Sequence, residues 1–544
     1  MPSGNFAWRR GAGDWRVPLR LVDPRPMPGV LVPAAVLPPP GLKTLRITMK
    51  LNLDPNSLAD YRTFIAAKGL PRFRCVGRQI EFPDEYASML GLTPVVNADA
   101  KPYKPMKELF DYQRDIAKLS IRKKKFCVFA QCGLGKDLMM KEAARYASES
   151  LAPDKKILMM EPLNCIGQSL EETERWYGKK MRVEQVKSKN LNDWLMGSGG
   201  RIGICNYDAL NDETPQGNLG ALLLNESSVL KSSGTWARAT IRMGAGLEFK
   251  WAYTGTPAPN DRIEYANHAV FMDAFPTVNS FLARYFVNKG QTQERWILKP
   301  HSLAKFYREI SHWCIFLENP ATYGFKDNTE SIPPINVHIH EVDLTGEQRE
   351  AVYEMTGKLF MDEPGGITTR AKLSQIGKGS YKGESIESLK PEFISNLVQS
   401  WPTESTIIWC HYNDEQDGME RLFPDAASIA GKTKHADRVE LIRDFQQGKR
   451  RILISKGEIL GFGLNLQIAT RHVFSGLQDS YEEFHQCVKR SNRIGSTIPL
   501  NVHIPCTEIE RPMINNVLEK AHCVEFDTAE QERIFKESGV ILWD

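Results

Sequence analysis

The sequence predicts an α/β protein built around parallel β-sheets. Short apolar runs that resemble buried strands alternate with longer stretches of helical periodicity, a pattern typical of parallel sheets. These strand-like runs are residues 126–129, 157–160, 203–205, 221–224 and 251–254. A chain of 544 residues is too long for one ordinary domain and suits about three or four.

Composition excludes several classes of protein. The hydrophobic fraction, 42%, is ordinary for a globular chain, and no run approaches the ~20 apolar residues of a membrane span. The ten cysteines form no Cys-x-x-Cys pair, so neither a zinc site nor a disulfide framework is indicated, and we expect a reducing cytoplasm. A net charge of +4 is compatible with local basic patches but does not by itself indicate a polyanionic partner.

Residues 1–48 hold nine prolines and no glutamate, and arginine carries most of their positive charge. We expect a disordered Pro/Arg-rich leader, translated from sequence upstream of a start at Met49. The alternative is a nucleic-acid-binding arm that uses the arginines at positions 9, 10, 16 and 20.

Residues 49–100 predict a small accessory module of mixed α and β structure. A helix is expected over 58–68, an alternating hairpin over 73–82 and a second helical stretch over 83–92. An edge subdomain that only packs on the next domain is an equally good interpretation.

A glycine loop at residues 130–137 joins the apolar run 126–129 to a helical stretch over 138–147. Strand, glycine loop, lysine and helix are the parts of a phosphate-binding loop. The glycines at 133 and 135 allow backbone N–H groups to approach phosphates, and Lys136 reaches the terminal phosphates. A plain glycine turn is the alternative, but a Gly-Lys pair at this junction disfavours it.

Residues 276–335 are rich in aromatic side chains interleaved with Arg284, Lys289, Arg295 and Lys299. Such a pattern occurs where bases stack on aromatic rings, but aromatic residues are more often core. We therefore expect a helical insertion or bridge.

Residues 478–495 contain two arginines, Arg490 and Arg493, three positions apart, with Gln486 four positions before the first. We expect all three on one face of a helix that ends at Gly495. Two permanent charges aimed at one point suit a phosphoryl group, although a solvated basic face has the same pattern.

Together these segments resemble the superfamily-two helicase-like ATPases, most closely the Swi/Snf-type branch found in bacteriophage-like DEAD/DEAH-box helicases. The resemblance runs from about Phe110 to Cys506. The matching motifs, in the order of the family, are residues 110–113 (Q), 130–137 (I), 161–168 (Ia), 204–210 (Ib), 222–231 (II), 253–260 (III), 406–413 (IV), 461–467 (V) and 478–495 (VI).

The resemblance implies two tandem RecA-like lobes with parallel sheets, with ATP and Mg²⁺ bound in the cleft between them. The implied segments are lobe 1 at 101–275, the bridge at 276–335, lobe 2 at 336–510 and C-terminal helices at 511–544. The implied partner is DNA, duplex or branched rather than RNA. We expect a monomer in the cytoplasm of a bacterial host cell, with replication or recombination proteins as further partners and no membrane.

The resemblance also assigns roles to individual residues. It implies catalytic roles for Lys136, Glu226, Arg490 and Arg493. It implies nucleotide contacts by Gln113, Gly133, Gly135, Lys136, Asp137, Gly463 and Gln486. It implies a magnesium site formed by Asp137, Asn225 and Glu226.

Two positions depart from the family pattern. Asp137 stands where a Ser or Thr hydroxyl binds magnesium, and Asn225 stands where an aspartate precedes the catalytic glutamate. Either Asp137 compensates as a direct magnesium ligand, or the exchange impairs the site and slows turnover. We expect slow, metal-dependent turnover.

Three functions remain open from the sequence. The first is a nucleic-acid-stimulated ATPase that translocates on, unwinds or anneals DNA. The second is a nucleotide- and DNA-binding scaffold with a degenerate ATPase site. The third, an endonuclease-coupled motor, requires a partner chain because no Asp…Glu-x-Lys nuclease cluster is evident.

Overall fold

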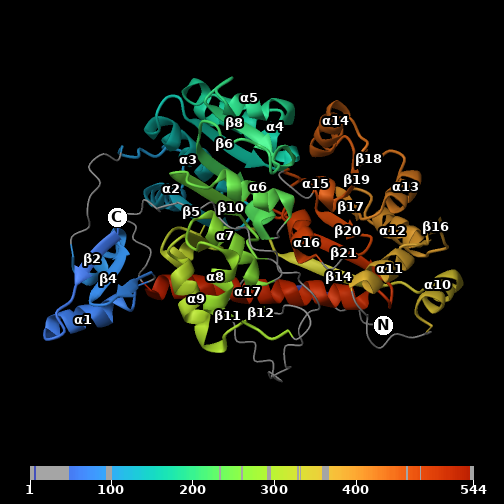
Figure 1. Cartoon of the computed structure of the whole chain (residues 1–544). Helices are drawn as coiled ribbons and strands as arrows, with labels where there is room; N and C mark the ends of the chain where they lie inside the picture. The colour runs from blue at the N-terminus through green and yellow to red at the C-terminus, as the bar shows by residue number, and fades with distance from the viewer. Residues whose placement is uncertain are drawn as a thin grey trace. The chain divides into compact units, whose positions relative to one another are not determined.

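The structure is a computed structural model that divides into two compact units (Figure 1). We call Val30–Lys326 with Asp527–Asp544 the amino-terminal unit, and Met1–Gly29 with Asp327–Phe526 the carboxy-terminal unit. The described residues are 5–7, 48–70, 72–92, 101–231, 234–258, 261–290, 296–327, 330, 332–357, 367–460, 464–477 and 480–538.

The amino-terminal unit contains a seven-stranded, fully parallel sheet in the order β13-β5-β10-β9-β6-β8-β7. Its strands are β5 (Lys125–Ala130), β6 (Lys156–Glu161), β7 (Val183–Gln185), β8 (Ile202–Asn206), β9 (Leu219–Asn225), β10 (Phe249–Thr254) and β13 (Cys314–Leu317). Every residue of β6, β9 and β10 is buried, as expected when helices cover both faces of a parallel sheet.

The helices of this unit precede the first strand of the sheet, β5, or lie between its later strands along the chain. They are α2 (Asp111–Lys123), α3 (Lys136–Ser150), α4 (Leu163–Tyr177), α5 (Leu191–Leu195), α6 (Thr235–Met243), α7 (Tyr265–Phe271), α8 (Val278–Tyr285) and α9 (Leu303–Ile310). All seven strands run in the same direction, and the helices provide the crossovers between them. The carboxyl ends of the strands therefore lie at one edge of the sheet.

The expected accessory module is a three-stranded antiparallel sheet with one helix, drawn in blue in Figure 1. Its elements are β2 (Thr48–Asn52), α1 (Leu58–Ala67), β3 (Arg74–Val76) and β4 (Gln79–Pro83). The stretch 83–92, expected to be helical, forms only the short 3-10 turns Asp84–Tyr86 and Ser88–Leu90. Gly91 at φ 70° ends the second turn.

The segment 276–335, expected to be a helical bridge, contributes α8 and α9 but also strands. β11 (Phe286–Asn288) and β12 (Trp296–Leu298) form a hairpin, and β13 is the edge strand of the main sheet beside β5. Its aromatic side chains, including Phe281, Tyr285 and Trp313, are buried in the core of this unit.

The carboxy-terminal unit contains a second seven-stranded sheet in the order β1-β14-β21-β20-β17-β19-β18. Only β1 is antiparallel. The strands are β1 (Asn5–Ala7), β14 (Ile335–Glu341), β17 (Thr406–Cys410), β18 (Ala427–Ile429), β19 (Ile452–Lys456), β20 (Arg471–Phe474) and β21 (Leu500–Cys506). Most of the expected leader 1–48 lies outside the described residues, apart from β1 and Thr48.

The remaining elements of this unit are mostly helical. They are α10 (Gly346–Thr356), α11 (Ile367–Gly377), the two-residue strands β15 (Ser380–Tyr381) and β16 (Glu384–Ser385), α12 (Lys390–Gln399), α13 (Asn413–Leu422), α14 (His435–Gln446), α15 (Gly457–Leu460), α16 (Tyr481–Val488) and α17 (Arg511–Ser538). The expected helices of 511–544 are one helix, α17, whose residues up to Phe526 belong to this unit and whose later residues belong to the other.

The structure therefore confirms the predicted fold class, which is two α/β units with parallel sheets, the RecA-like arrangement, and a small N-terminal α+β module. None of the helices in the described part of the chain is both long enough and apolar enough to cross a lipid bilayer.

A buried ion-pair cluster joins three elements of the carboxy-terminal unit. Glu510 is fully buried and lies 2.5 Å from Lys390 Nζ and 3.2 Å from Lys378 Nζ. Burial alone would raise the pKa of Glu510, but the charges of Lys390 and Lys378 lower it to about 2. A Cβ atom at Gly476 would lie 2.7 Å from Glu510 Oε1, so this glycine makes room for the cluster.

We predict that Glu510→Gln lowers the free energy of unfolding by about 3–5 kcal/mol, because it leaves two buried lysines without a counter-charge. Glu508→Gln is the matched control, because Glu508 forms a half-exposed pair with Arg349 worth less than about 1 kcal/mol. Urea denaturation of both variants measures the difference. Equal midpoints would show that the buried cluster adds no more than the surface pair.

Candidate functional site

The loop after β5 has the backbone shape that its sequence predicts. Gly133 and Gly135 both adopt left-handed conformations, at φ 90° and φ 75°, and α3 begins directly after them at Lys136. Side chains other than glycine are strained at such angles. The first N–H groups of a helix have no partners within the helix, so this loop and the start of α3 can bind an anion.

Lys136 is buried and folds back over the loop. Its Nζ donates a hydrogen bond to the carbonyl oxygen of Ala130 over 2.8 Å. Gly255, directly after β10, faces the same position, because a Cβ atom there would lie 3.4 Å from Lys136 Nζ and 3.3 Å from Ala130 O. The ends of β5 and β10 thus enclose the ammonium group.

Gln113, expected to bind the adenine base, packs against the loop from α2. Its Nε2 donates to Leu134 O over 3.1 Å, and its Oε1 accepts from the N–H of Phe110 over 3.0 Å. A Cβ atom at Gly135 would overlap Gln113 Nε2, so the second glycine is required for this contact. The Phe110 ring beside it is half exposed and stacks on Tyr112.

Asp137 points away from the loop into a polar cluster between α3 and α4. Its carboxylate forms an ion pair with Lys141 one helical turn later and lies 3.3 Å from Ser169 Oγ. Glu172 lies 3.6 Å from the same Lys141 ammonium. Burial raises the pKa of Asp137 to about 6, although Lys141 lowers it.

Asn225 and Glu226 follow β9 at the same edge of the sheet. Asn225 Oδ1 accepts a hydrogen bond from the N–H of Glu226 over 3.1 Å, and the Asn225 carbonyl accepts from Tyr207 over 2.7 Å. Glu226 adopts φ 49°, which is uncommon for a residue other than glycine and marks local strain. Thr254 Oγ1, at the end of β10, lies 3.4 Å from Glu226 Oε2.

Glu161 ends β6 beside these residues, and its position in the sequence marks it only as the first residue of motif Ia. The side chain is fully buried, and Ser169 Oγ donates to its Oε1 over 2.9 Å. Burial raises the pKa of Glu161 well above its usual range, and the nearby charge of Asp137 adds to this rise. The available signal was a carboxylate directly after four apolar residues of a buried strand.

The structure thus brings Gln113, Gly133, Gly135 and Lys136 together around one loop. Asn225 and Glu226 lie together at the end of β9, whereas Asp137 lies in the first turn of α3 and contacts Lys141 and Ser169 instead. Among the residues that the structure describes, no three or more His, Cys, Asp or Glu side chains form a group that could hold a metal ion by themselves. A cation here would need ligands from the nucleotide or from water as well.

The other candidate residues belong to the carboxy-terminal unit, and one expectation about them is wrong. Arg490 and Arg493 do not share a helix face, because α16 ends at Val488 and both lie in the turns that follow. Ser491 Oγ donates to Leu466 O over 2.8 Å, and Asn492 Nδ2 donates to Pro333 O over 2.7 Å. These contacts with distant parts of the chain bend the backbone out of the helix.

Gln486 and Arg490 nevertheless act as a pair. Arg490 is buried, and its Nη2 donates to Gln486 Oε1 over 2.7 Å while its Nε donates to the Gln486 carbonyl over 3.1 Å. Arg493 is partly exposed, and its N–H lies 3.3 Å from Ser496 Oγ. Gly463, expected to contact the nucleotide, lies outside the described residues.

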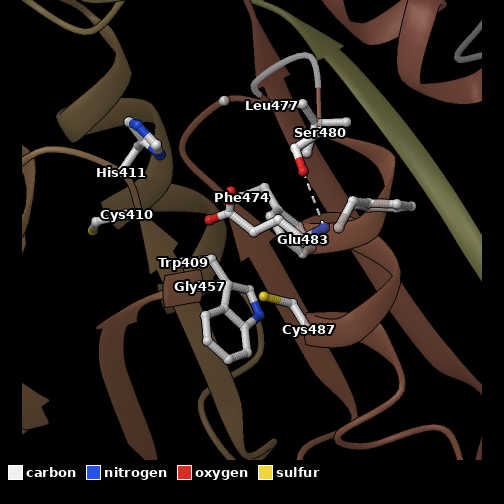
Figure 2. A pocket seen from close by; sticks show the side chains of 11 residues that line it. Trp409, Cys410, His411, Gly457, Phe474, Leu477, Ser480, Glu483 and Cys487 are labelled. Atoms are coloured by element: carbon white, nitrogen blue, oxygen red, sulfur yellow. Dashed lines mark hydrogen bonds between the residues drawn. The ribbon is translucent and has the colours of Figure 1, made fainter. Parts of the chain in front are cut away.

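A small cavity lies at the carboxyl ends of β17, β19 and β20, next to α16 (Figure 2). Ser480 caps α16 by accepting from the N–H of Glu483 over 3.3 Å. The Glu483 side chain lies so close to Gly457 that a Cβ atom there would overlap it. The lining residues are Trp409, Cys410, His411, Gly457, Phe474, Gly476, Leu477, Ser480, Glu483, Phe484 and Cys487.

Comparison with known proteins finds helicases. Residues 389–495, which include β17, β19, β20, α16 and both arginines, match the family model of the helicase conserved C-terminal domain. Similar curated proteins include the ATP-dependent RNA helicase FAL1 of Kluyveromyces lactis, 24% identical over 206 residues that cover 36% of this chain and 50% of the relative. The FAL1 of Eremothecium gossypii is 26% identical over 182 residues, covering 32% and 45%.

The chain thus spans about half the length of the curated relatives it matches. Among solved structures, the Sulfolobus solfataricus SWI2/SNF2 ATPase core in complex with dsDNA aligns over 80% of this chain and 98% of that one, at 17% identity. The TM-score of this alignment is 0.37.

We predict that Glu483→Gln stabilises the carboxy-terminal unit at pH 8 but not at pH 5. Burial raises the pKa of Glu483 to about 7, and the charge of Glu458 adds to this effect. Because the folded protein holds the proton more tightly than the unfolded chain, stability falls as pH rises from about 4.5 to 7. The glutamine imitates the protonated acid and removes this loss.

Thermal unfolding at both pH values measures this effect. Glu440→Gln, an exposed position on α14, serves as the control and should leave the midpoint unchanged at either pH. A stability difference that does not depend on pH would contradict the assignment to this carboxyl group.

Proposed function

We propose that this chain is an ATP-dependent helicase or translocase, in which ATP hydrolysis stimulated by nucleic acid is coupled to movement on that nucleic acid. The observation that carries the proposal is the phosphate-binding loop of Gly133, Gly135 and Lys136 at the carboxyl ends of parallel strands. The match of residues 389–495 to the helicase C-terminal domain supports it independently, because that segment belongs to the other unit.

The loop fits the triphosphate of ATP. The backbone N–H groups of the glycine loop and of the first turn of α3 are hydrogen-bond donors, and the Lys136 ammonium is a cation, so both suit phosphate anions. In the proposal, Lys136 binds the terminal phosphates, Glu226 orients the attacking water, and Gln113 ties base recognition to the shape of the loop. Bound Mg²⁺ would supply further charge neutralisation at the phosphates.

We propose that the nucleic acid is DNA. The motif pattern favours duplex or branched DNA, whereas the curated relatives are named RNA helicases. The sequence resemblance leads us to propose five further properties. They are membership of the Swi/Snf-type branch, a bacteriophage-like origin, a monomeric state, replication or recombination partners and a location in the bacterial cytoplasm.

A second candidate function is a nucleotide- and DNA-binding scaffold that turns over slowly or not at all. The pairing of Asp137 with Lys141 favours it, because a carboxylate already neutralised within the protein is a weaker magnesium ligand. Asn225 favours it as well, because an amide binds magnesium less strongly than the carboxylate it replaces.

The experiment that separates these functions is ATP hydrolysis by the full chain without nucleic acid and with duplex DNA, single-stranded DNA or RNA. Stimulation by DNA that weakens as salt rises supports the motor, because phosphate contacts release counterions. Stimulation by RNA alone would reassign the substrate. Nucleotide binding without turnover under every condition would establish the scaffold.

We predict that Lys136→Ala abolishes nucleotide binding or turnover, because it removes the ammonium group that the phosphate-binding loop itself contributes to the terminal phosphates. Titration with a fluorescent ATP analogue measures the affinity. Lys118→Ala, an exposed lysine on α2, is the control and should bind as the wild type does. Unchanged affinity in Lys136→Ala would refute the phosphate-loop assignment.

We predict that Arg490→Lys and Arg493→Ala lose turnover by about 10³-fold or more while ATP affinity stays nearly constant, as for arginine fingers. Lysine is used at position 490 because Arg490 is buried against Gln486 and alanine would leave a hole. Lys489→Ala is the control for a change of charge at a neighbouring position. Loss of affinity without a separate effect on rate would identify the arginines as structural.

A further inference from the structure

Glu161 and Asn225 stand side by side at the edge of the sheet. In the parallel pairing of β6 with β9, Met160 is the partner of Leu224, so the next residues, Glu161 and Asn225, are neighbours at the two strand ends. Asn225 occupies the position where the family pattern has a carboxylate, and Glu161 supplies a carboxylate one strand away.

Asp137 is poorly placed to replace that lost charge. Its carboxylate forms an ion pair with the fully buried Lys141, and Ser169 Oγ contacts its other oxygen at 3.3 Å. A magnesium ion bound by Asp137 would have to compete with an ammonium group that already neutralises it.

The surroundings of the Glu161 carboxyl group differ from those of Asp137. The Glu161 side chain is fully buried, Ser169 Oγ holds Oε1 at 2.9 Å, and the Asn225 side chain faces the same carboxyl group. Among the residues that the structure describes, Oε2 has no hydrogen-bond partner of ordinary geometry, and the Asn225 side chain is the polar group that interacts with this carboxyl group besides Ser169. A buried carboxyl oxygen without a partner is unusual and calls for a ligand that satisfies it.

We propose that Glu161 provides the carboxylate that contacts the divalent cation accompanying the nucleotide, replacing the one lost at Asn225, and that Asp137 is not a metal ligand. The inference rests on the proposed function, because the cation arrives with the phosphates. Hard divalent cations prefer carboxylate oxygens, and amide oxygens also ligate them. Because burial raises the pKa of Glu161, the cation replaces the proton that the buried carboxyl group otherwise holds, and that proton is released to solvent. Asn225 and Ser169 orient Glu161 through their contacts with its carboxyl group.

The test measures binding rather than turnover. A fluorescent, non-hydrolysable ATP analogue is titrated into the full chain with Mg²⁺ and again with excess EDTA, and the ratio of the two affinities is the magnesium enhancement. We expect Glu161→Gln to reduce this enhancement about tenfold, a loss typical of disturbed metal sites, while affinity in EDTA is kept. Mn²⁺ binding with the analogue, followed by electron paramagnetic resonance, should weaken in parallel.

Three further variants sharpen the test. Adding Asn225→Asp to Glu161→Gln should restore the enhancement, because a carboxylate returns to the neighbouring strand end. Glu172→Gln is the matched control, because Glu172 also lies near Lys141 and should leave the enhancement unchanged. If Glu161→Gln does not fold, Glu161→Asp keeps the charge but withdraws it by one methylene group, and the enhancement should still fall.

If the magnesium enhancement survives in Glu161→Gln, this inference is wrong while the proposed function stands. The same conclusion follows if Asp137→Asn loses the magnesium enhancement. Wild-type protein that binds no nucleotide under either condition would overturn the proposed function and this inference together. The two failures are therefore distinguishable in one set of titrations.

Discussion

The constraint on which the candidate site depends is the parallel pairing of β5, β10, β9 and β6 in the amino-terminal unit. Because parallel strands all end at the same edge, four short segments far apart in the sequence are forced into one row. In the order of the sheet, the ends of these four strands carry the glycine loop with Lys136, then Thr254, then Asn225 with Glu226, and finally Glu161. No local propensity could bring these residues together.

The fold class and the backbone conformation of the glycine loop could be predicted from the sequence because both depend on short-range signals. Apolar runs mark buried strands, and glycines at 133 and 135 mark left-handed backbone. The end of α16 could not be predicted, because Asn492 and Ser491 leave the helix to bond Pro333 and Leu466, which are distant in the sequence. The role of β13 was missed for a similar reason, since an edge strand inside a helix-rich segment is recognised only by its partner β5.

The surroundings of the candidate metal ligands were equally hidden from the sequence. Asp137 was expected to contact the nucleotide and its magnesium ion, but Lys141 on the next helical turn and Ser169 on α4 contact its carboxylate. Glu161 was placed at the start of motif Ia, after the apolar run 157–160, and only the register of β6 against β9 makes it the neighbour of Asn225. Buried charges were therefore the least predictable part of the molecule, because their partners come from separate elements.

The contact between Gln113 and Gly135 has a consequence for the thermodynamics of ligand binding. Gln113 bonds the Leu134 carbonyl and fills the space where a side chain at 135 would lie, so α2 acts as a template for the loop. The loop therefore takes its shape when the amino-terminal unit folds, and the conformational entropy is lost at that stage rather than on association. A ligand that enters a preorganised loop keeps more of its interaction energy as affinity.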